Sequence, residues 1–264
     1  MKHKIHTALS IAGSDPCGGA GIQADLKTFQ ACGVYGMAVV AAITVQNTAG
    51  VKRAVCLDPG LVAEQIDALL DDIPPDAIKT GMLGNGEIVR VVAETLSGHG
   101  IRHLVVDPVI YASDTTALLA DQNFETMKNS LFPLATVITP NMHEASLLTG
   151  IKVQDLDTMI SATEMLHALG VRYVIITGGH LPASEQAVDV LYDGDGHHLM
   201  PGIRLQEGEQ VHGSGCVFSA ALTANLARGA DIIKAAEQAK RFVFKTLQSA
   251  AHIGHGKPNT NTIF

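Results

Sequence analysis

The stretch "TALSIAGSDPCGGAGIQAD" (residues 7–25) joins an apolar run to a helical pattern through a turn rich in glycine. Residues 7–12 are apolar enough for a buried strand, and a helical pattern begins at residue 21. Bare backbone at such a turn lets a phosphate or a small substrate lie against main-chain amides. The stretch therefore predicts a strand–turn–helix unit that holds a ligand at its turn.

The rest of the chain repeats this alternation of short apolar runs and longer helical patterns. The predicted strands cover residues 7–12, 37–46, 77–81, 103–109, 135–141 and 173–179. The predicted helices cover residues 21–32, 60–72, 85–97, 117–131, 141–149, 157–169, 214–228 and 231–250. This order indicates an α/β fold with a doubly wound, mostly parallel sheet and helices on both faces. The sequence predicts one domain over residues 1–264, with a hairpin in 187–200 and a surface strap at 254–264.

The composition narrows the class of protein. The 264 residues carry a net charge of −8, no tryptophan and no basic cluster, which argues against nucleic-acid binding. The longest apolar stretch, residues 37–45, is far shorter than the roughly 20 residues of a membrane span. The four cysteines show no CxxC spacing. We therefore expect a cytoplasmic protein with free thiols and with neither nucleic acid nor membrane as a partner.

Polar sequences stand where the predicted strands end. In an open parallel sheet, ligands gather at the carboxyl ends of the strands, so these sequences predict one shared cleft. The chain contains neither GxxxxGK[ST] nor a complete GxGxxG at residues 18–21, so no P-loop or dinucleotide site is predicted. The strand-end sequences are "AGSDPCGGAG", "VQNT", "KTGML", "DPV", "TPNMHE" and "TGGH".

The strongest local signal is "HGSGCVFSAALTANLARG" (residues 212–229), in which Gly213, Ser214 and Gly215 precede a helix of small residues. Successive amides at a helix start can bind one anion, assisted by the helix dipole. Cys216 lies in the first turn, where thiol pKa values fall, so it is a candidate to act beside an attacking hydroxyl. The alternative is a tight helix start with a buried cysteine that serves as a small apolar side chain.

A second group of polar residues suits a metal ion that carries phosphates. Asp107 ends an apolar strand, and Asn141 and Glu144 lie three residues apart after the next strand. Carboxylate and amide oxygens are ligands that suit hydrated Mg²⁺. The alternative is an Asn141 N-cap with a capping Glu144, and both descriptions can hold together.

Three further strand-end features leave two interpretations each. Thr177 and Gly179 offer a hydroxyl and bare amides to nucleotide phosphates, or they merely end a strand. Gln46 can read the donor and acceptor edge of a flat heterocycle, or it can satisfy nearby backbone. Asp25 is either a solvated helix carboxylate or a residue that faces the cleft.

These motifs, in this order, resemble the hydroxymethylpyrimidine and phosphomethylpyrimidine kinases of the ribokinase superfamily, over about residues 7–250. The resemblance implies a ribokinase-like fold, ATP and Mg²⁺ as cofactors, a small pyrimidine substrate and a homodimer. It places the first glycine-rich loop over the pyrimidine pocket and the nucleotide phosphates mostly at the C-terminal glycine motif. The implied pocket residues are Gln46, Gly13, Ala20, Met82 and Val109, with Asp25 as a neighbour.

The resemblance also implies roles at the reacting end of the cleft. Gly213, Ser214 and Gly215 would form the anion hole, and Cys216 would take the place of the basic aspartate of related sugar kinases. Asp107, Asn141 and Glu144 would organise magnesium and phosphates.

Two departures from the family pattern bear on the second phosphorylation. Thr177 stands where many members have lysine, and "IYASDT" follows "DPV" where many read "MVAKSG". Both changes remove positive charge near the expected phosphates. A pyridoxal or pyridoxine kinase on the same scaffold and a non-catalytic vitamin-binding module remain alternatives. Residues 112–123 are polar at their start and are a candidate mobile segment, and the sequence leaves open whether they close over the site.

Overall fold

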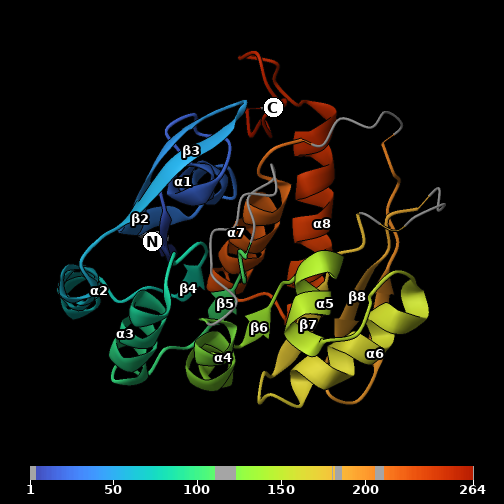
Figure 1. Cartoon of the computed structure of the whole chain (residues 1–264), viewed down its shortest axis with the longest axis horizontal. Coiled ribbons are helices and arrows are strands. Elements are labelled where there is room, and N and C mark those ends of the chain that lie inside the picture. Colours follow the sequence, from blue (N-terminus) through green and yellow to red (C-terminus); the bar gives the residue numbers. More distant parts are fainter. Residues whose placement is uncertain (1–3, 111–122, 180, 182–185, 206–210, 264) are drawn as a thin grey trace.

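The computed structural model describes residues 4–110, 123–179, 181, 186–205 and 211–263, in which strands and helices alternate (Figure 1). The strands are β1 (Thr7–Gly13), β2 (Tyr35–Asn47), β3 (Gly50–Cys56), β4 (Ala77–Thr80), β5 (Leu104–Val106), β6 (Val137–Ile138), β7 (Tyr173–Ile176), β8 (Asp189–Tyr192) and β9 (His197–Met200). The α-helices are α1 (Gly21–Ala31), α2 (Pro59–Asp72), α3 (Gly86–Ser97), α4 (Phe124–Thr126), α5 (Met142–Thr149), α6 (Leu156–His167), α7 (Ser214–Ala227) and α8 (Ile232–Gln248). A π turn, η2 (Met127–Leu131), and a 3-10 turn, η3 (Phe132–Leu134), follow α4.

All nine strands form one sheet in the order β3-β2-β1-β4-β5-β6-β7-β8-β9. The strands from β2 to β7 in this order are parallel, whereas β3, β8 and β9 pair antiparallel at the two edges. The mostly parallel sheet confirms the predicted fold class. β1 lies between β2 and β4, so the order of the strands reverses at β1. In open parallel sheets, ligands bind beside the carboxyl ends of the strands at such a reversal, so a crevice is expected there.

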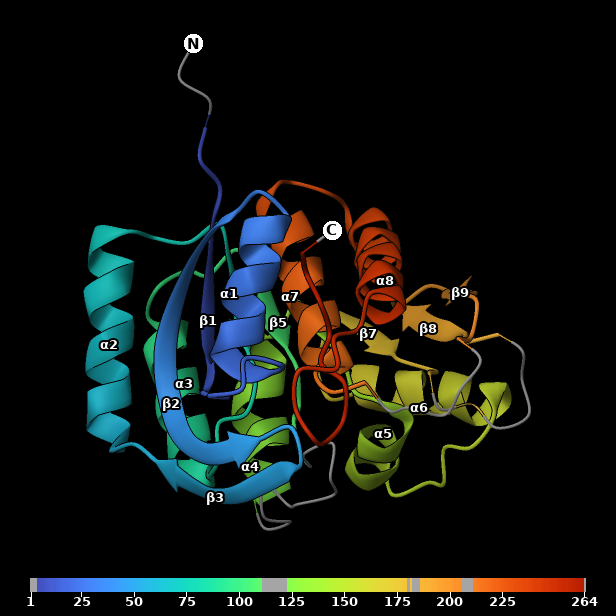
Figure 2. The same ribbon diagram turned by 90° about the horizontal axis from the view of Figure 1, so that it is seen from above.

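Helices cover both faces of the sheet. Figure 1 shows α1, α7 and α8 on one face and α2, α3, α4 and α6 on the other, and Figure 2 shows α7 between α1 and α8. Alternate residues of β1 point to opposite faces, because Leu9 and Ile11 join the core under α2 and α3 while Ala8 packs near α1 and α7. Burial of each such leucine or isoleucine side chain favours the folded state by roughly 1.5–3 kcal/mol.

The structure corrects several predicted boundaries. The edge strand β3 was not predicted, because most of its residues are exposed and Lys52 and Arg53 break the apolar pattern. The strands predicted over 103–109 and 135–141 are shorter, since Pro108 and Pro140 have no backbone N–H to continue a ladder. Within the described residues, the helix predicted over 117–131 begins at Phe124. The predicted mobile segment 112–123 lies outside the described residues except for Asn123.

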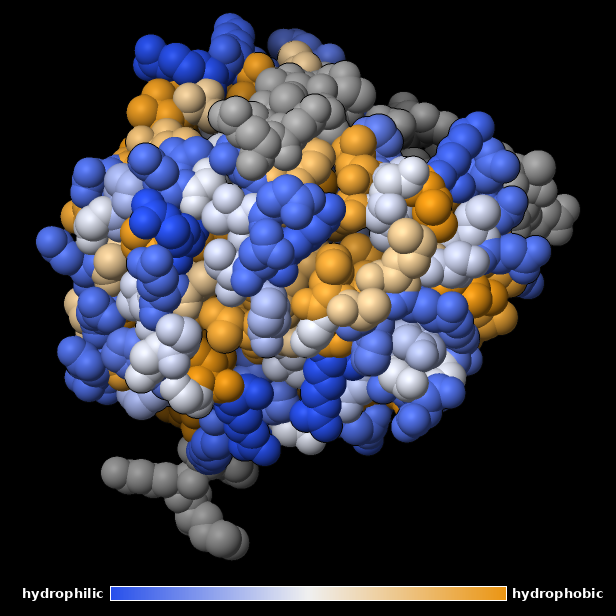
Figure 3. All heavy atoms as spheres, turned by 60° about the horizontal axis from the view of Figure 1, so that its bottom comes forward, coloured by the Kyte–Doolittle hydropathy of each residue, from blue (hydrophilic) through white to orange (hydrophobic). Residues whose placement is uncertain are grey.

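The C-terminal tail is more than a surface strap. Ala251 and His212 both form isolated bridges with Asn259, which is buried. The predicted hairpin is present as β8 and β9. In the described part of the chain, no helix combines the length and apolar character needed to cross a membrane. On the face drawn in Figure 3, apolar side chains come to the surface in separate patches between hydrophilic ones.

Candidate active site

Asp15 organises the glycine-rich turn between β1 and α1. Its Oδ1 accepts the backbone N–H of Cys17, and its Oδ2 accepts the backbone N–H groups of Gly19 and Ala20, at 3.0, 3.1 and 2.8 Å. The Cys17 thiol also donates to Oδ2. The carboxylate is buried in the curve of the loop, and so residues 15–20 wrap around one negative charge.

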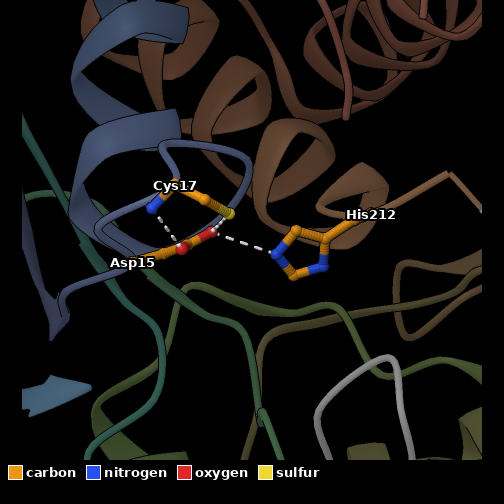
Figure 4. A group of neighbouring side chains, drawn as sticks. All are labelled: Asp15, Cys17 and His212. Atoms are coloured by element: carbon orange, nitrogen blue, oxygen red, sulfur yellow. Dashed lines mark hydrogen bonds and ion pairs between the residues drawn. The ribbon is translucent and has the colours of Figure 1, made fainter. Parts of the chain in front are cut away.

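Asp15 also binds the segment that precedes α7. Nε2 of His212 lies 3.0 Å from Oδ2 of Asp15 (Figure 4). The same nitrogen lies 3.1 Å from Nε2 of Gln46, near the end of β2. Burial alone would raise the pKa of Asp15, but hydrogen bonds from His212 and Cys17 outweigh it and hold that pKa below its ordinary value. Asp15 is therefore ionised at neutral pH.

Asp15, Cys17 and His212 offer ligand atoms that all lie within 4.8 Å of one another (Figure 4). Their proximity is explained by hydrogen bonds, because both Asp15 oxygens accept backbone N–H groups of the loop and Oδ2 also lies within hydrogen-bond distance of His212.

The two glycine-rich turns are in contact at Gly19 and Gly213. Gly213 has φ +90°, and a Cβ at this position would lie 1.7 Å from the carbonyl oxygen of Gly19. Among the described residues, no side chain caps the start of α7. The amides of Ser214, Gly215 and Cys216 precede the first N–H that bonds within the helix, that of Val217. Amides at such a helix start, assisted by the helix dipole, can bind an anion, and these lie beside the first loop.

Cys216 does not have the lowered pKa expected for a helix start. Burial, helped by the charges of Asp107 and Asp25, raises the pKa of its thiol to about 12, because these effects exceed the opposite effect of the Lys79 charge. A backbone N–H at Gly21 favours the thiolate only weakly. Cys216 is thus a thiol in the resting protein, and the expectation of easy thiolate formation was wrong.

Asp25 and Lys79 form a fully buried ion pair behind the cleft. Lys79 Nζ lies 2.6 Å from Asp25 Oδ1, and the Ser10 hydroxyl donates to Asp25 Oδ2 at 2.6 Å. Burial alone would lower the pKa of Lys79, but the Asp25 charge outweighs it and the pKa lies above its usual value. Both oxygens of Asp25 are engaged and neither side chain is exposed, so Asp25 is neither a solvated carboxylate nor placed for direct contact with a ligand.

The predicted metal residues come together at the ends of β5 and β6. Asp107 Oδ2 accepts the hydroxyl of Ser219 in α7 at 2.8 Å. Asn141 and Glu144 form a capping box at the start of α5, which confirms the capping interpretation. Burial and, second, the charge of Asp107 together raise the pKa of Glu144 to about 8. The two carboxyl groups are therefore close enough to repel each other.

The loop after β7 lies beside Asn141. Thr177 forms a parallel bridge with Asn141, and the Gly178 amide donates to Asp189. The carbonyl of the exposed Gly179 accepts from the guanidinium of Arg204 at 3.1 Å. The backbone of Thr177 and Gly179 is thus held at the same edge of the sheet as Asp107.

The predicted pocket residues fall on neighbouring strand ends. The Gly13 amide donates to the Met82 carbonyl, and a Cβ on Gly13 would meet Met82 Cε at 2.8 Å. Ala20 stands at the N-cap of α1, and Val109 follows Asp107 with its side chain partly exposed. Gln46 lies against His212.

Sequence reasoning assigned no role to Asp15, His212 or Lys79. The motif Ser14-Asp15-Pro16 before two glycines is typical of an aspartate that bonds its own loop, and this signal was available. Lys79 interrupts an apolar strand, which is unusual for a buried strand. The pairing of His212 with Asp15 has no local signal, because the two residues lie 197 positions apart.

Comparison with known proteins shows which protein family the chain resembles. The family model described as phosphomethylpyrimidine kinase matches residues 15–261. A hydroxymethylpyrimidine/phosphomethylpyrimidine kinase of Bacillus subtilis is 42% identical over 257 residues, which are 97% of this chain and 94% of that protein. A pyridoxine kinase of the same organism is 41% identical over 249 residues, 93% of this chain and 92% of that protein.

A solved structure also resembles the chain. An ADP complex of Bacillus subtilis pyridoxal kinase superimposes with a TM-score of 0.90 and 39% identity, and the match covers 98% of both chains. This likeness confirms the fold expected from the sequence.

Proposed function

The chain belongs to the phosphomethylpyrimidine kinase family, and on that premise we propose that it transfers the γ-phosphoryl group of ATP to the hydroxymethyl group of 4-amino-5-hydroxymethyl-2-methylpyrimidine, in thiamine biosynthesis. It acts next on the monophosphate to give the diphosphate. The observation that carries this proposal is the contact between two glycine turns, which places the uncapped start of α7 beside the first loop. A single kinase domain over residues 1–264 performs both steps.

Phosphoryl transfer needs positioning and charge stabilisation more than covalent chemistry. The acceptor oxygen attacks the γ-phosphorus in line, and the amides of Ser214, Gly215 and Cys216 stabilise the charge that develops on the equatorial oxygens. Cys216 accepts or relays the hydroxyl proton. Burial raises the pKa of Cys216 to about 12, so the resting protein holds the thiol and little thiolate. A relay of the proton through the thiol is therefore favoured over its acceptance by a thiolate.

ATP and Mg²⁺ are the proposed cofactors. Burial, together with the charge of Asp107, raises the pKa of Glu144 to about 8, and two carboxyl groups that repel each other in this way suit a divalent cation. Asp107 and Glu144 would hold Mg²⁺, directly or through water, and the ion would neutralise phosphate charge. Asn141, Thr177 and Gly179 lie along the same sheet edge and would contact the nucleotide phosphates.

Gln46, Gly13, Ala20, Met82 and Val109 form the proposed pyrimidine pocket. The Met82 side chain fills the space that a Cβ on Gly13 would take, so a flat ring can lie against the thioether. Asp25 supports this pocket from behind through Lys79.

A pyridoxal or pyridoxine kinase is the second candidate, because relatives with that name match as fully as the pyrimidine kinases. The test incubates the protein with ATP and Mg²⁺ and, separately, with hydroxymethylpyrimidine, its monophosphate or pyridoxal, and reads products by mass. Diphosphate from the monophosphate supports the full proposal and shows that Thr177 is tolerated. Preference for pyridoxal supports the second candidate, and tight binding without product supports a non-catalytic binding module. Tubes with EDTA in place of Mg²⁺ test the metal.

The proposed partner surface is a second copy of the chain. Ile43, Val45 and Val55 lie exposed on one face of the β2–β3 edge, where Ile43 pairs with Val55. Light scattering should give twice the chain mass of 27.7 kDa, and I43E should give the monomer mass. The cytoplasm is the proposed compartment, supported by four free cysteines.

A further inference from the structure

One ring nitrogen of His212 lies close to two polar groups at once. Nε2 is 3.0 Å from Oδ2 of Asp15 and 3.1 Å from the amide nitrogen of Gln46. A ring nitrogen carries either a proton or a free lone pair. Nε2 therefore cannot donate to Asp15 and also accept from the Gln46 amide nitrogen.

Asp15 decides whether Nε2 of His212 carries a proton. Its carboxylate is buried and accepts backbone N–H groups from Cys17, Gly19 and Ala20. Those donors and His212 keep it ionised, and an ionised carboxylate only accepts. Nε2 of His212 must therefore carry the proton and donate it to Asp15, as the geometry in Figure 4 allows.

The protonated Nε2 in turn orients Gln46. An amide nitrogen that faces an N–H group is repelled, whereas the amide oxygen at the same place accepts from it. The oxygen and nitrogen of a side-chain amide exchange places by a half-turn, and the surrounding hydrogen bonds decide between the two positions. With the oxygen toward His212, the NH₂ group points away from the imidazole. The ladder of β2 and β3 shifts register between Val45 and Gln46, an irregularity that re-aims a side chain.

We propose that Asp15 and His212 are positioning residues that fix the Gln46 amide so that its NH₂ group donates to the bound heterocycle. The ligand must then offer an acceptor on that edge, such as the lone pair of a ring nitrogen. This inference rests on the proposed function, in which Gln46 faces the ring. It assigns substrate specificity to a residue pair that does not itself contact the reacting atoms.

The first test observes the protonation of His212 in the wild-type protein without any turnover. Long-range ¹H–¹⁵N NMR of the ¹⁵N-labelled protein, with the His212 signals assigned by comparison with H212F, should show Nε2 bonded to hydrogen. An Nε2 without hydrogen would overturn the proposal. This result does not depend on whether the protein is a kinase.

The second test compares the dissociation constants of two ligands by calorimetry. Hydroxymethylpyrimidine has an acceptor ring nitrogen beside its amino group, which donates. In the 4-oxo analogue the same ring nitrogen carries a hydrogen and donates, and the neighbouring oxygen accepts. The wild type should prefer the amino ligand by at least about tenfold, the cost of one mispaired buried group. H212A and H212F, the latter of which keeps a ring, should both lose most of this preference because the amide can turn.

The matched control is H198A, which removes a second histidine whose Nε2 lies 2.8 Å from an aspartate, Asp193, on the β8–β9 turn. H198A should keep the wild-type preference. An unchanged preference in both His212 variants would overturn the proposal. If the wild type binds neither ligand, the proposed function fails and the ligand part of this inference fails with it, while the NMR result still decides the Asp15–His212 geometry.

Discussion

Nε2 of His212 lies 3.0 Å from Oδ2 of Asp15, and this contact joins two glycine-rich turns that are 197 residues apart. Asp15 holds the loop that follows β1, and His212 directly precedes the start of α7. A carbonyl of the first loop, that of Gly19, also packs under Gly213. The proposed substrate loop and the proposed anion hole therefore form one structural unit. A substitution that distorts one of the two turns should also disturb the other.

Replacing Asp15 by asparagine should destabilise the protein and weaken pyrimidine binding. The amide nitrogen of asparagine would face donors that now point at Oδ2, so D15N should lower the free energy of unfolding by about 1–3 kcal/mol. Urea unfolding measures this change, and KM for the pyrimidine should rise. D193N is the control, because Asp193 also accepts backbone N–H groups but in an exposed turn. Equal effects of D15N and D193N would contradict the organising role of Asp15.

Two glycines of the proposed anion hole should respond oppositely to alanine. A Cβ on Gly213 would lie 1.7 Å from the Gly19 carbonyl oxygen and would require φ +90°, so G213A should abolish most activity and lower stability. A Cβ on Gly215 meets nothing within 4 Å, so G215A should keep most of the wild-type kcat. Steady-state kinetics and thermal unfolding compare the two. Tolerance of G213A would mean that the two turns are not in contact.

Cys216 should make turnover depend on pH if its thiolate accepts the proton. Burial raises the pKa of Cys216 to about 12, so the thiolate fraction rises about tenfold per pH unit below that value. The kcat of the wild type should then rise from about pH 7 to about pH 9, and C216A should lower kcat by about 10²-fold or more and remove the slope. A flat wild-type profile together with near-normal turnover of C216A would exclude the base role and leave positioning.

The buried pair of Asp25 and Lys79 should act as one unit. K79M leaves a buried carboxylate without its partner and should lower the free energy of unfolding by about 3–5 kcal/mol, whereas D25N/K79M should cost less than the sum of the single variants. A double-mutant cycle by urea unfolding measures the coupling. The control pair is Lys4 and Asp76, which is 2.8 Å apart with Lys4 mostly exposed. Its coupling should not exceed about 1 kcal/mol, and equal coupling in both pairs would contradict the role of burial.

The parallel core of the fold followed from local pattern. The runs that became β1 and β7 are almost entirely apolar, as strands covered on both faces must be, whereas β4 carries the buried Lys79. The edge strand β3 escaped prediction because its side chains are mostly exposed and therefore carry no apolar alternation. The shortening of β5 and β6 came from prolines, whose effect on a ladder depends on where the neighbouring strand ends.

The sequence by itself determined the order of the parallel strands and of the helices between them, the glycine turns before α1 and α7, and the polar residues at the strand ends. These features depend on neighbours along the chain, where periodicity and turn chemistry act. Only the tertiary structure decided that Asp15 binds His212, that Lys79 neutralises Asp25 out of reach of solvent, and that the pKa of Cys216 rises instead of falling. Burial and charge pairing depend on segments far apart in the chain, and a desolvated thiol or carboxyl group responds to those segments more than to its own helix.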